Sequence, residues 1–351
     1  MENKKYLIIY HKEDNDGVFS GAIFKDYLLN VLNVSEEKID LLPADYNILS
    51  NFAQVYNDPL SLKELYSHII MTDLSFNDYK YMIKLYNVYQ SDFIWVDHHA
   101  PIIQCSIDKN FDSIPGLRDT SRSAILCAWK YLYDQFDEAY NQKRVPELFR
   151  ILSGWDSWTY KKEGYEFEYV KNINKGITNR YNLDIDIVLK LIKDLRLIYL
   201  NNEQSGRFSV LYKDSYLIKE VYKEGKLFNE YEDKIMENII KTSGDCSWKI
   251  RFEDEDKGHP LYHSACAIFH QGASNSTMFK CLKNKGIHHG LVFKHQPNGN
   301  WVLSMYNINE EEWTHCGEFL KERYNGGGHK GAAGCTLSEN QFIKILKDKI
   351  L

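Results

Sequence analysis

The chain has 351 residues, of which 44% are hydrophobic and 26% charged, so it can bury the cores of two globular domains. Its net charge of −6 argues against a broad, sequence-independent grip on long nucleic acid, which needs a basic surface, but not against a short anionic substrate. No apolar window is long enough for a membrane span, and the apolar run at residues 6–10 is too short for a signal peptide. The seven cysteines include no Cys-x-x-Cys pair, so we expect reduced thiols and a cytoplasmic location.

The first part of the chain alternates short apolar runs with helical patterns. Apolar runs that predict buried strands lie at residues 6–10, 39–42, 68–72 and 92–96. Helical patterns lie at residues 18–32, 79–88 and 121–136. Such an alternation predicts an α/β fold with a doubly wound parallel sheet.

The rest of the chain changes character twice. Charged helical patterns without proline at residues 183–200 and 225–241 predict a helical connector. Further strands are expected at residues 248–252, 262–269, 290–294 and 300–306, with helices at 317–323 and 341–350. We therefore expect a catalytic domain at residues 1–160, the connector at 161–243 and a smaller α/β substrate-binding domain at 244–351.

Acidic residues and histidines follow three of the predicted strands. The first strand leads into His11, Asp14 and Asp16, the third into Asp73, and the fourth into Asp97-His98-His99. Asp156 ends the helical stretch that begins near residue 145. Ligands of doubly wound sheets bind beyond the carboxyl ends of the strands, so we expect these side chains to meet at one edge.

Each of these residues has an ordinary structural explanation when it is taken alone. Aspartates are favoured as helix caps and in turns, so Asp14, Asp16 and Asp73 could serve there. Several carboxylates at one place, however, repel one another unless cations lie between them. Carboxylates and imidazoles without thiolates favour Mn²⁺ or Mg²⁺, and an aspartate between two such ions would form the two-metal arrangement that hydrolyses phosphate esters.

Taken together, these segments resemble the DHH superfamily of phosphoesterases with its C-terminal DHHA1 domain. Within that superfamily the chain is most similar to the B-type oligoribonucleases, because Arg122 lies in an Asp-Thr-Ser-Arg-Ser-Ala run, Asp156 lies in Trp-Asp-Ser-Trp, and a long helical connector follows. The matching motifs occur in the family's order along nearly the whole chain: Asp14-Asn15-Asp16-Gly17, Asp73, Asp97-His98-His99, Asp156 and Gly326-Gly327-Gly328-His329-Lys330-Gly331-Ala332-Ala333-Gly334.

The resemblance implies a role for each residue of the cluster. One metal would be held by His11, Asp14 and Asp73, and a second by Asp16, Asp73, His98 and Asp156, with Asp73 bridging. His99 would face the scissile phosphate, and Asp97 would support the metal-binding imidazole. The implied cofactors are two Mn²⁺ ions, or Mg²⁺ or another divalent ion.

Substrate contacts are expected mainly from the C-terminal part. Gly326, Gly327 and Gly328 permit a close approach of backbone amides to an anion, and His329 and Lys330 could add hydrogen bonds or charge. Tyr306 stands where related domains often carry an arginine, so it either stacks on a base or packs in the core. Arg122 either meets a phosphate or is a solvated cation at a helix start.

We therefore expect a metal-dependent phosphodiesterase that releases mononucleotides from short single-stranded oligonucleotides by means of a metal-activated hydroxide. Two alternatives stay open. One keeps the metals but acts on 3′-phosphoadenosine 5′-phosphate, on linear or cyclic dinucleotides, or on polyphosphate. The other is a non-catalytic nucleotide sensor. Nothing in the sequence indicates a membrane partner or a particular homo-oligomer.

Overall fold

The computed structural model divides the chain into two compact units, Met1–Phe228 and Asn229–Leu351. The division into residues 1–160, 161–243 and 244–351 stays a prediction. The structure describes residues 4–76, 78–108, 113–133, 145–200, 207–252, 261–272, 276–308, 315–328 and 331–351.

The first unit is built on a four-stranded parallel sheet with the strand order β2-β1-β3-β4. In the register of this sheet, Ile8 of the central strand lies between Leu41 and Ile70. The strands are β1 (Lys5–His11), β2 (Ile39–Ala44), β3 (Tyr66–Thr72) and β4 (Phe93–Val96). All four predicted strands are therefore present, and the parallel sheet is confirmed.

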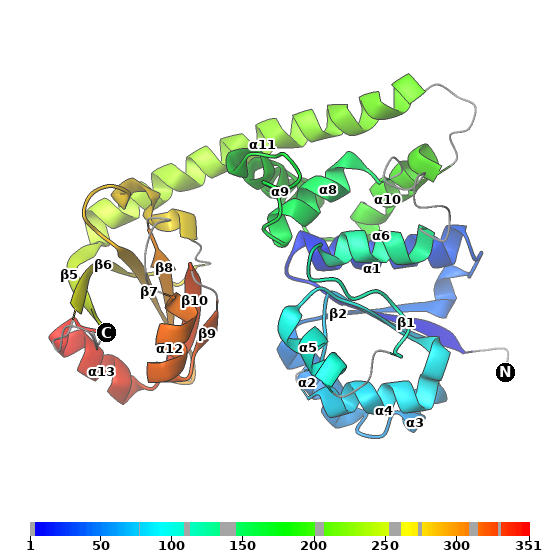
Figure 1. Cartoon of the computed structure of the whole chain (residues 1–351), viewed down its shortest axis with the longest axis horizontal. Coiled ribbons are helices and arrows are strands. Elements are labelled where there is room, and N and C mark those ends of the chain that lie inside the picture. Colours follow the sequence, from blue (N-terminus) through cyan, green and yellow to red (C-terminus); the bar gives the residue numbers. More distant parts are fainter. Residues whose placement is uncertain are drawn as a thin grey trace. The chain divides into compact units, whose positions relative to one another are not determined.

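Both faces of this sheet are covered, because neighbouring side chains of a strand point to opposite sides. Ile8 and Tyr10 face one core, whereas Leu7 and Ile9 face the other. Helices α1 (Asn15–Asn30), α6 (Ala124–Tyr133) and α8 (Glu147–Asp156) belong to the first core. On the opposite face lie α2 (Tyr46–Val55), α3 (Leu60–Lys63), α4 (Tyr79–Tyr89) and α5 (Ala100–Asp108) (Figure 1). This two-sided cover is the doubly wound arrangement that the alternating pattern predicts.

Three further helices follow, namely α9 (Phe167–Tyr181), α10 (Ile185–Leu200) and α11 (Arg207–Ser243). The first two contribute Ile173, Ile177 and Val188 to the core around α1. A buried ion pair between Arg196 and Asp26 also ties α10 to α1. In this structure α9 and α10 are therefore packed parts of the first unit.

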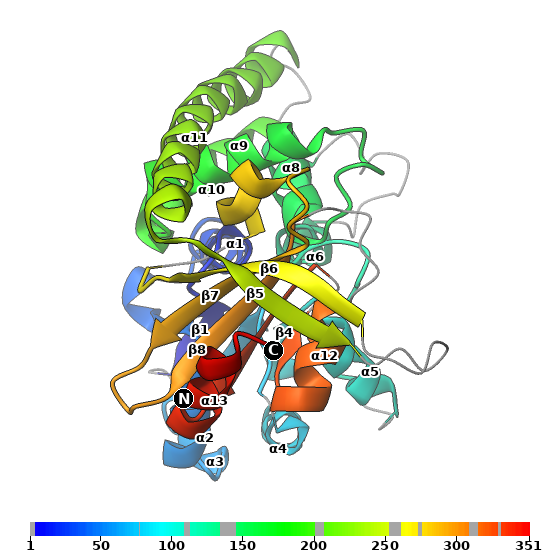
Figure 2. The ribbon, with the colours of Figure 1, turned by 90° about the vertical axis from the view of Figure 1, so that its left-hand side faces the viewer.

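The second unit contains a six-stranded mixed sheet with the order β5-β6-β7-β8-β10-β9. Only β6 and β7 run parallel; the other neighbours are antiparallel. The strands are β5 (Asp245–Phe252), β6 (Leu261–Phe269), β7 (His289–His295), β8 (Trp301–Asn307), β9 (Gly327–Gly328) and β10 (Ala332–Leu337). Figure 2 shows β5 to β8 of this sheet. The α/β class of the whole chain is thus confirmed.

Each face of the second sheet has its own core. Helices α12 (Cys316–Tyr324) and α13 (Glu339–Asp348) cover one face, where Trp248, Leu291 and Phe342 pack. The other face is covered by the end of α11 and by the 3₁₀ helix η3 (Ser276–Leu282).

Two further 3₁₀ helices, η1 (Glu36–Lys38) and η2 (Gln90–Asp92), precede β2 and β4 in the first unit. Across the described residues, no helix has the length and hydrophobicity that crossing a membrane requires.

His289 begins β7 and is fully buried. Its Nε2 lies 3.1 Å from Nδ1 of His263, so each ring restricts the protonation of the other. Burial, together with the neighbouring His263, lowers the pKa of His289 from 6.5 to about 3. The folded protein therefore holds this imidazole neutral.

We predict that His289 makes the second unit sensitive to acid. Its pKa is lower in the folded state than in the unfolded chain, so its stabilising effect is complete above pH 6.5 and is lost as the pH falls towards 3. Between these values the free energy of unfolding should drop by about 1.4 kcal/mol per pH unit from this group. Denaturant titrations at several pH values should show a flatter dependence for His289→Gln; parallel curves would contradict the prediction.

Candidate metal centre

The six predicted metal ligands meet at one edge of the parallel sheet. His11 is the last residue of β1, Asp73 directly follows β3, and Asp156 is the last residue of α8. Among the described residues, three groups of side chains have ligand atoms within 4.8 Å of one another. They are His11, Asp14 and Asp73; Asp16, His98 and Asp156; and Asp73, His98 and His99. The first equals one set implied by the resemblance, and the second contains the other set except for Asp73. The carboxyl ends of the strands thus gather the acidic residues, as the topology predicts.

Asp73 lies between the groups. Its Oδ2 is 3.6 Å from Nδ1 of His11, and its Oδ1 is 3.3 Å from Nε2 of His98. The backbone at Asp73 has a φ of +57°, an unusual conformation for a residue with a side chain. Strain of this kind costs on the order of 1–3 kcal/mol and persists where the surroundings impose it. Here the Asp73 amide donates to the carbonyl of Val96 at 3.0 Å, which fixes the turn.

The first group combines a helix cap with a ligand set. Asp14 Oδ1 accepts from the Gly17 amide at 2.9 Å and so caps α1. Its other oxygen, Oδ2, lies 2.9 Å from Nδ1 of His11. Burial by itself would lower the pKa of His11, but hydrogen bonds to Asp14 and Asp73 outweigh it and raise that pKa to about 10. The capping and ligand interpretations of Asp14 are therefore compatible, because each uses a different oxygen.

The second group surrounds one imidazole nitrogen. Nε2 of His98 lies 3.1 Å from Asp156 Oδ2 and 3.5 Å from Asp16 Oδ2. Asp16 is also fixed by α6, since its two oxygens accept from the amides of Ala124 and Ile125 at 2.7 and 2.9 Å. The partial positive charge of a helix start favours a carboxylate at this place.

The charges of this cluster are not balanced within the described residues. Burial, followed by mutual repulsion, raises the pKa of Asp73 and Asp156 well above the ordinary range, and burial also raises that of Asp16. Asp73 Oδ1 and Asp156 Oδ2 are buried and make no hydrogen bond in the described part of the chain. Both face His98 Nε2, and one nitrogen cannot donate to several oxygens. Divalent cations with oxygen and imidazole ligands fit this donor set.

The carboxylate of Asp97 contacts the ring of His99 rather than the ring of His98. Its Oδ1 lies 2.8 Å from Nδ1 of His99 and also accepts the His98 amide at 2.7 Å, while its Oδ2 accepts from the indole of Trp95 at 3.2 Å. The hydrogen bond to Asp97 raises the pKa of His99. The resemblance implied that Asp97 supports the metal-binding imidazole, and that role stays a prediction. The third group also makes His99 an alternative metal ligand.

Two predicted substrate residues have partners of their own. Arg122 forms an ion pair with Asp119 at 2.7 Å, so its charge is partly compensated. Tyr306 is only 7% exposed and belongs to the core that includes Phe279. The structure therefore favours the packing role of Tyr306, because stacking on a base would require its ring to leave that core.

The glycine run lies in the second unit. Gly327 and Gly328 form β9, which pairs with Ala333 and Gly334 of β10. Gly328 has a φ of +141°, and a Cβ there would lie 2.5 Å from the Cα of Ala333. Close strand pairing therefore explains part of the run. Gly326 precedes the strand, and His329 and Lys330 lie outside the described residues.

The sequence reasoning missed two residues near the centre. Tyr46 begins α2, and its pKa is raised by burial and then by the charges of Asp97, Asp73 and Asp14. Lys12 follows His11 and pairs with Asp45 at 3.2 Å. The end of β2 lies at the same sheet edge as those of β1 and β3. Asp45, the partner of Lys12, and Tyr46 follow the carboxyl end of β2. The expectation that functional residues follow the carboxyl ends of parallel strands would have identified them if it had been applied to this strand as well.

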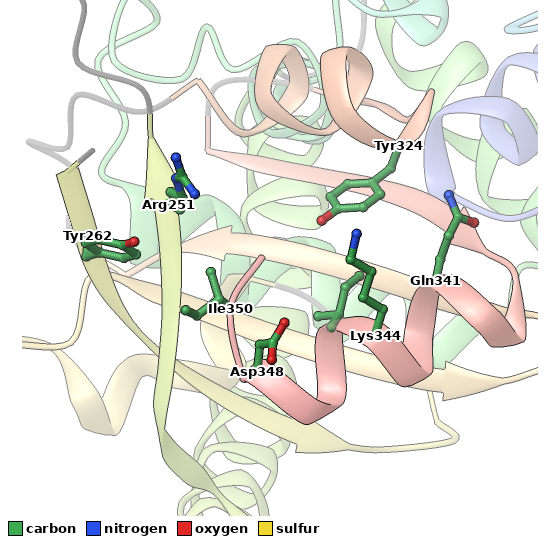
Figure 3. A pocket seen from close by; sticks show the side chains of 8 residues that line it. Arg251, Tyr262, Tyr324, Gln341, Lys344, Asp348 and Ile350 are labelled. Carbon is green, nitrogen blue, oxygen red and sulfur yellow. The ribbon is translucent and has the colours of Figure 1, made fainter. Parts of the chain in front are cut away.

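A separate pocket of about 530 Å³ lies in the second unit. Figure 3 shows Arg251 and Tyr262 on β5 and β6, and Lys344 and Asp348 on α13, around it. Both charge signs are present in its lining, and it contains none of the metal-ligand candidates. The pocket is therefore not part of the metal centre.

No model of a known protein family matches the sequence, and no curated protein matches it significantly. Solved structures do match nearly the whole chain. An uncharacterized protein from Helicobacter pylori is 17% identical, with 98% of each chain covered and a TM-score of 0.37. A pGpG-specific phosphodiesterase from Vibrio cholerae is 11% identical, with 98% of this chain and 97% of that one covered, and a TM-score of 0.44. An exopolyphosphatase-related protein from Bacteroides fragilis is 13% identical, with 99% and 91% covered, and a TM-score of 0.44. At these values the similarities carry no argument about activity.

We predict that Asp73→Asn stabilises the metal-free protein. The folded-state pKa of Asp73 is raised, so at neutral pH folding has to keep a charge that its surroundings disfavour. Asparagine removes that charge and tolerates a positive φ. The free energy of unfolding in EDTA should therefore increase.

The same substitution should weaken metal binding. The upward shift of the melting temperature on adding MnCl₂ should shrink in Asp73→Asn, because that shift reports binding to the folded state. Asp92→Asn, which changes a carboxylate outside the cluster, is the matched control. A destabilised Asp73→Asn protein with a full response to Mn²⁺ would contradict the assignment.

Proposed function

We propose that this protein is a Mn²⁺-dependent phosphodiesterase of the DHH type that hydrolyses short single-stranded oligonucleotides to mononucleotides. The observation that carries the proposal is the position of Asp73, whose two oxygens face His11 and His98. In this arrangement His11, Asp14 and Asp73 would hold one divalent ion, and Asp16, Asp73, His98 and Asp156 would hold the other.

The bound ions would supply the positive charge that activates water and neutralises the phosphate in such a reaction. The protein itself provides fixed positions. Asp16 is held by two amides of α6 and Asp14 by its capping bond, so neither carboxylate has to be reorganised when a substrate arrives. His99 is oriented by Asp97, so that its ring can form a hydrogen bond to a phosphoryl oxygen.

The substrate class is the open part of the proposal. Short oligonucleotides are our first choice. The alternatives that keep the metals are 3′-phosphoadenosine 5′-phosphate, linear or cyclic dinucleotides, and polyphosphate. Purified protein with Mn²⁺ should be assayed against a ribodinucleotide, a long single-stranded RNA, 3′-phosphoadenosine 5′-phosphate and polyphosphate. Turnover of another substrate with the dinucleotide left intact would refute the first choice. Metal analysis addresses the sensor alternative, since a sensor need not retain two ions.

We predict different outcomes for the adjacent histidines. His98→Asn should lose both metal and hydrolysis, because His98 faces three carboxylates. His99→Asn should keep its metal content and lower kcat by roughly 10²–10³-fold, the usual effect of removing one donor to a developing anion. Metal content measured by atomic emission, alongside kcat, separates the two. Loss of metal in His99→Asn would instead make His99 a ligand.

A further inference from the structure

Trp158 is an exposed and strained tryptophan two residues after the metal-ligand candidate Asp156. It is 66% exposed, although a large aromatic side chain is ordinarily buried. Its backbone has a φ of +57°, which is unusual for a bulky residue. The exposed indole and the positive φ both disfavour the folded state. Residues held in such strained conformations concentrate at functional sites.

The turn that carries Trp158 is held by specific contacts. After α8 ends at Asp156, the chain folds back so that the Tyr160 amide donates to the Gly154 carbonyl at 3.1 Å. A Cβ on Gly154 would lie 3.1 Å from the Cα of Tyr160, so only glycine permits this close return without a shift. The Ser157 hydroxyl adds bonds to the Ser153 carbonyl and to Thr159. The position of Trp158 is therefore set by the turn.

The indole is also held in a fixed orientation. It stacks on Phe167 with ring centroids 6.2 Å apart and planes 17° apart, and on Trp155 at 6.2 Å and 25°. Trp155 immediately precedes Asp156, whose carboxylate lies 3.1 Å from His98 Nε2. A rigid, exposed ring loses little conformational entropy when a planar group stacks on it, and this ring belongs to a residue two positions after Asp156.

We propose that Trp158 is the stacking surface for a nucleobase of the substrate. The inference rests on the proposed function, and it narrows the substrate to molecules that carry a base, which excludes polyphosphate. Base–aromatic stacking tolerates any base, because every base has a π-face. The site would therefore favour nucleotides over inorganic phosphates without selecting a sequence.

The test compares a ribodinucleotide with two analogues in which one or the other base is replaced by an abasic residue. In the wild-type protein, kcat/KM should fall by about tenfold for one of the analogues, in line with the loss of one stacked base. Trp158→Asn should lower kcat/KM for the intact dinucleotide by about tenfold and have no further effect on that analogue. Trp158→Phe, which keeps an aromatic ring, should retain most of the activity.

Asparagine is the chosen replacement because it tolerates the positive φ, so Trp158→Asn should fold without added backbone strain. Its melting temperature is measured beside the kinetics. Equal losses on the intact and abasic substrates would make the role of Trp158 structural and overturn the proposal. A change of oligomeric state in Trp158→Asn, seen by sedimentation, together with unchanged kinetics would also overturn it, since the ring would then be a protein contact.

A binding measurement separates this inference from the proposed function. Calorimetry of the Mn²⁺-loaded protein should give tighter binding for a nucleoside 5′-monophosphate than for ribose 5-phosphate, and Trp158→Asn should remove the difference. If that result holds while dinucleotides are not hydrolysed, the stacking surface stands and the proposed reaction fails. Equal binding of the two ligands by the wild-type protein would overturn the stacking surface itself.

Discussion

The first unit has to hold several buried carboxylates close together although they repel one another. Asp16, Asp73 and Asp156 are brought to one sheet edge, and the pKa of each is raised by burial. A fold that served stability alone would not keep this arrangement, because replacing such groups with apolar ones removes the desolvation penalty. The surrounding structure therefore fixes the cluster in advance, through the start of α6, the cap of α1 and the turn after β3. Divalent cations are the natural counter-charge.

The same local devices serve both folding and chemistry. Asp14 caps a helix with one oxygen and faces His11 with the other. Asp16 accepts hydrogen bonds from two backbone amides of α6, and one of its oxygens lies near His98. In the second unit, Gly328 enables the close pairing of β9 with β10. Capping and ligation are thus not competing explanations of these aspartates, because a carboxylate has two oxygens and several lone pairs.

Much of the fold could be predicted because its signals are local. The four parallel strands are apolar runs of the expected length, and the helices between them have clear periodicity. Helices α2 and α5 were not predicted, although they are about as long as α6 and α8. Strand β10 was missed because its small residues, beginning Ala332-Ala333-Gly334, have no strand-like alternation. Such a strand forms through its pairing with β8, which no local pattern reveals.

The sequence by itself determined which residues meet at the sheet edge, because the direction of parallel strands decides which residues follow their carboxyl ends. Only the tertiary structure decided how these residues share their contacts. In the folded protein Asp97 forms a hydrogen bond with the ring of His99, and the two oxygens of Asp73 face different histidines. Tyr306 is buried in a core. The tertiary structure also left Trp158, two residues after Asp156, exposed at the surface. Spacing along a chain fixes which segment a residue occupies, whereas side-chain orientation and burial depend on packing between segments that are distant in sequence.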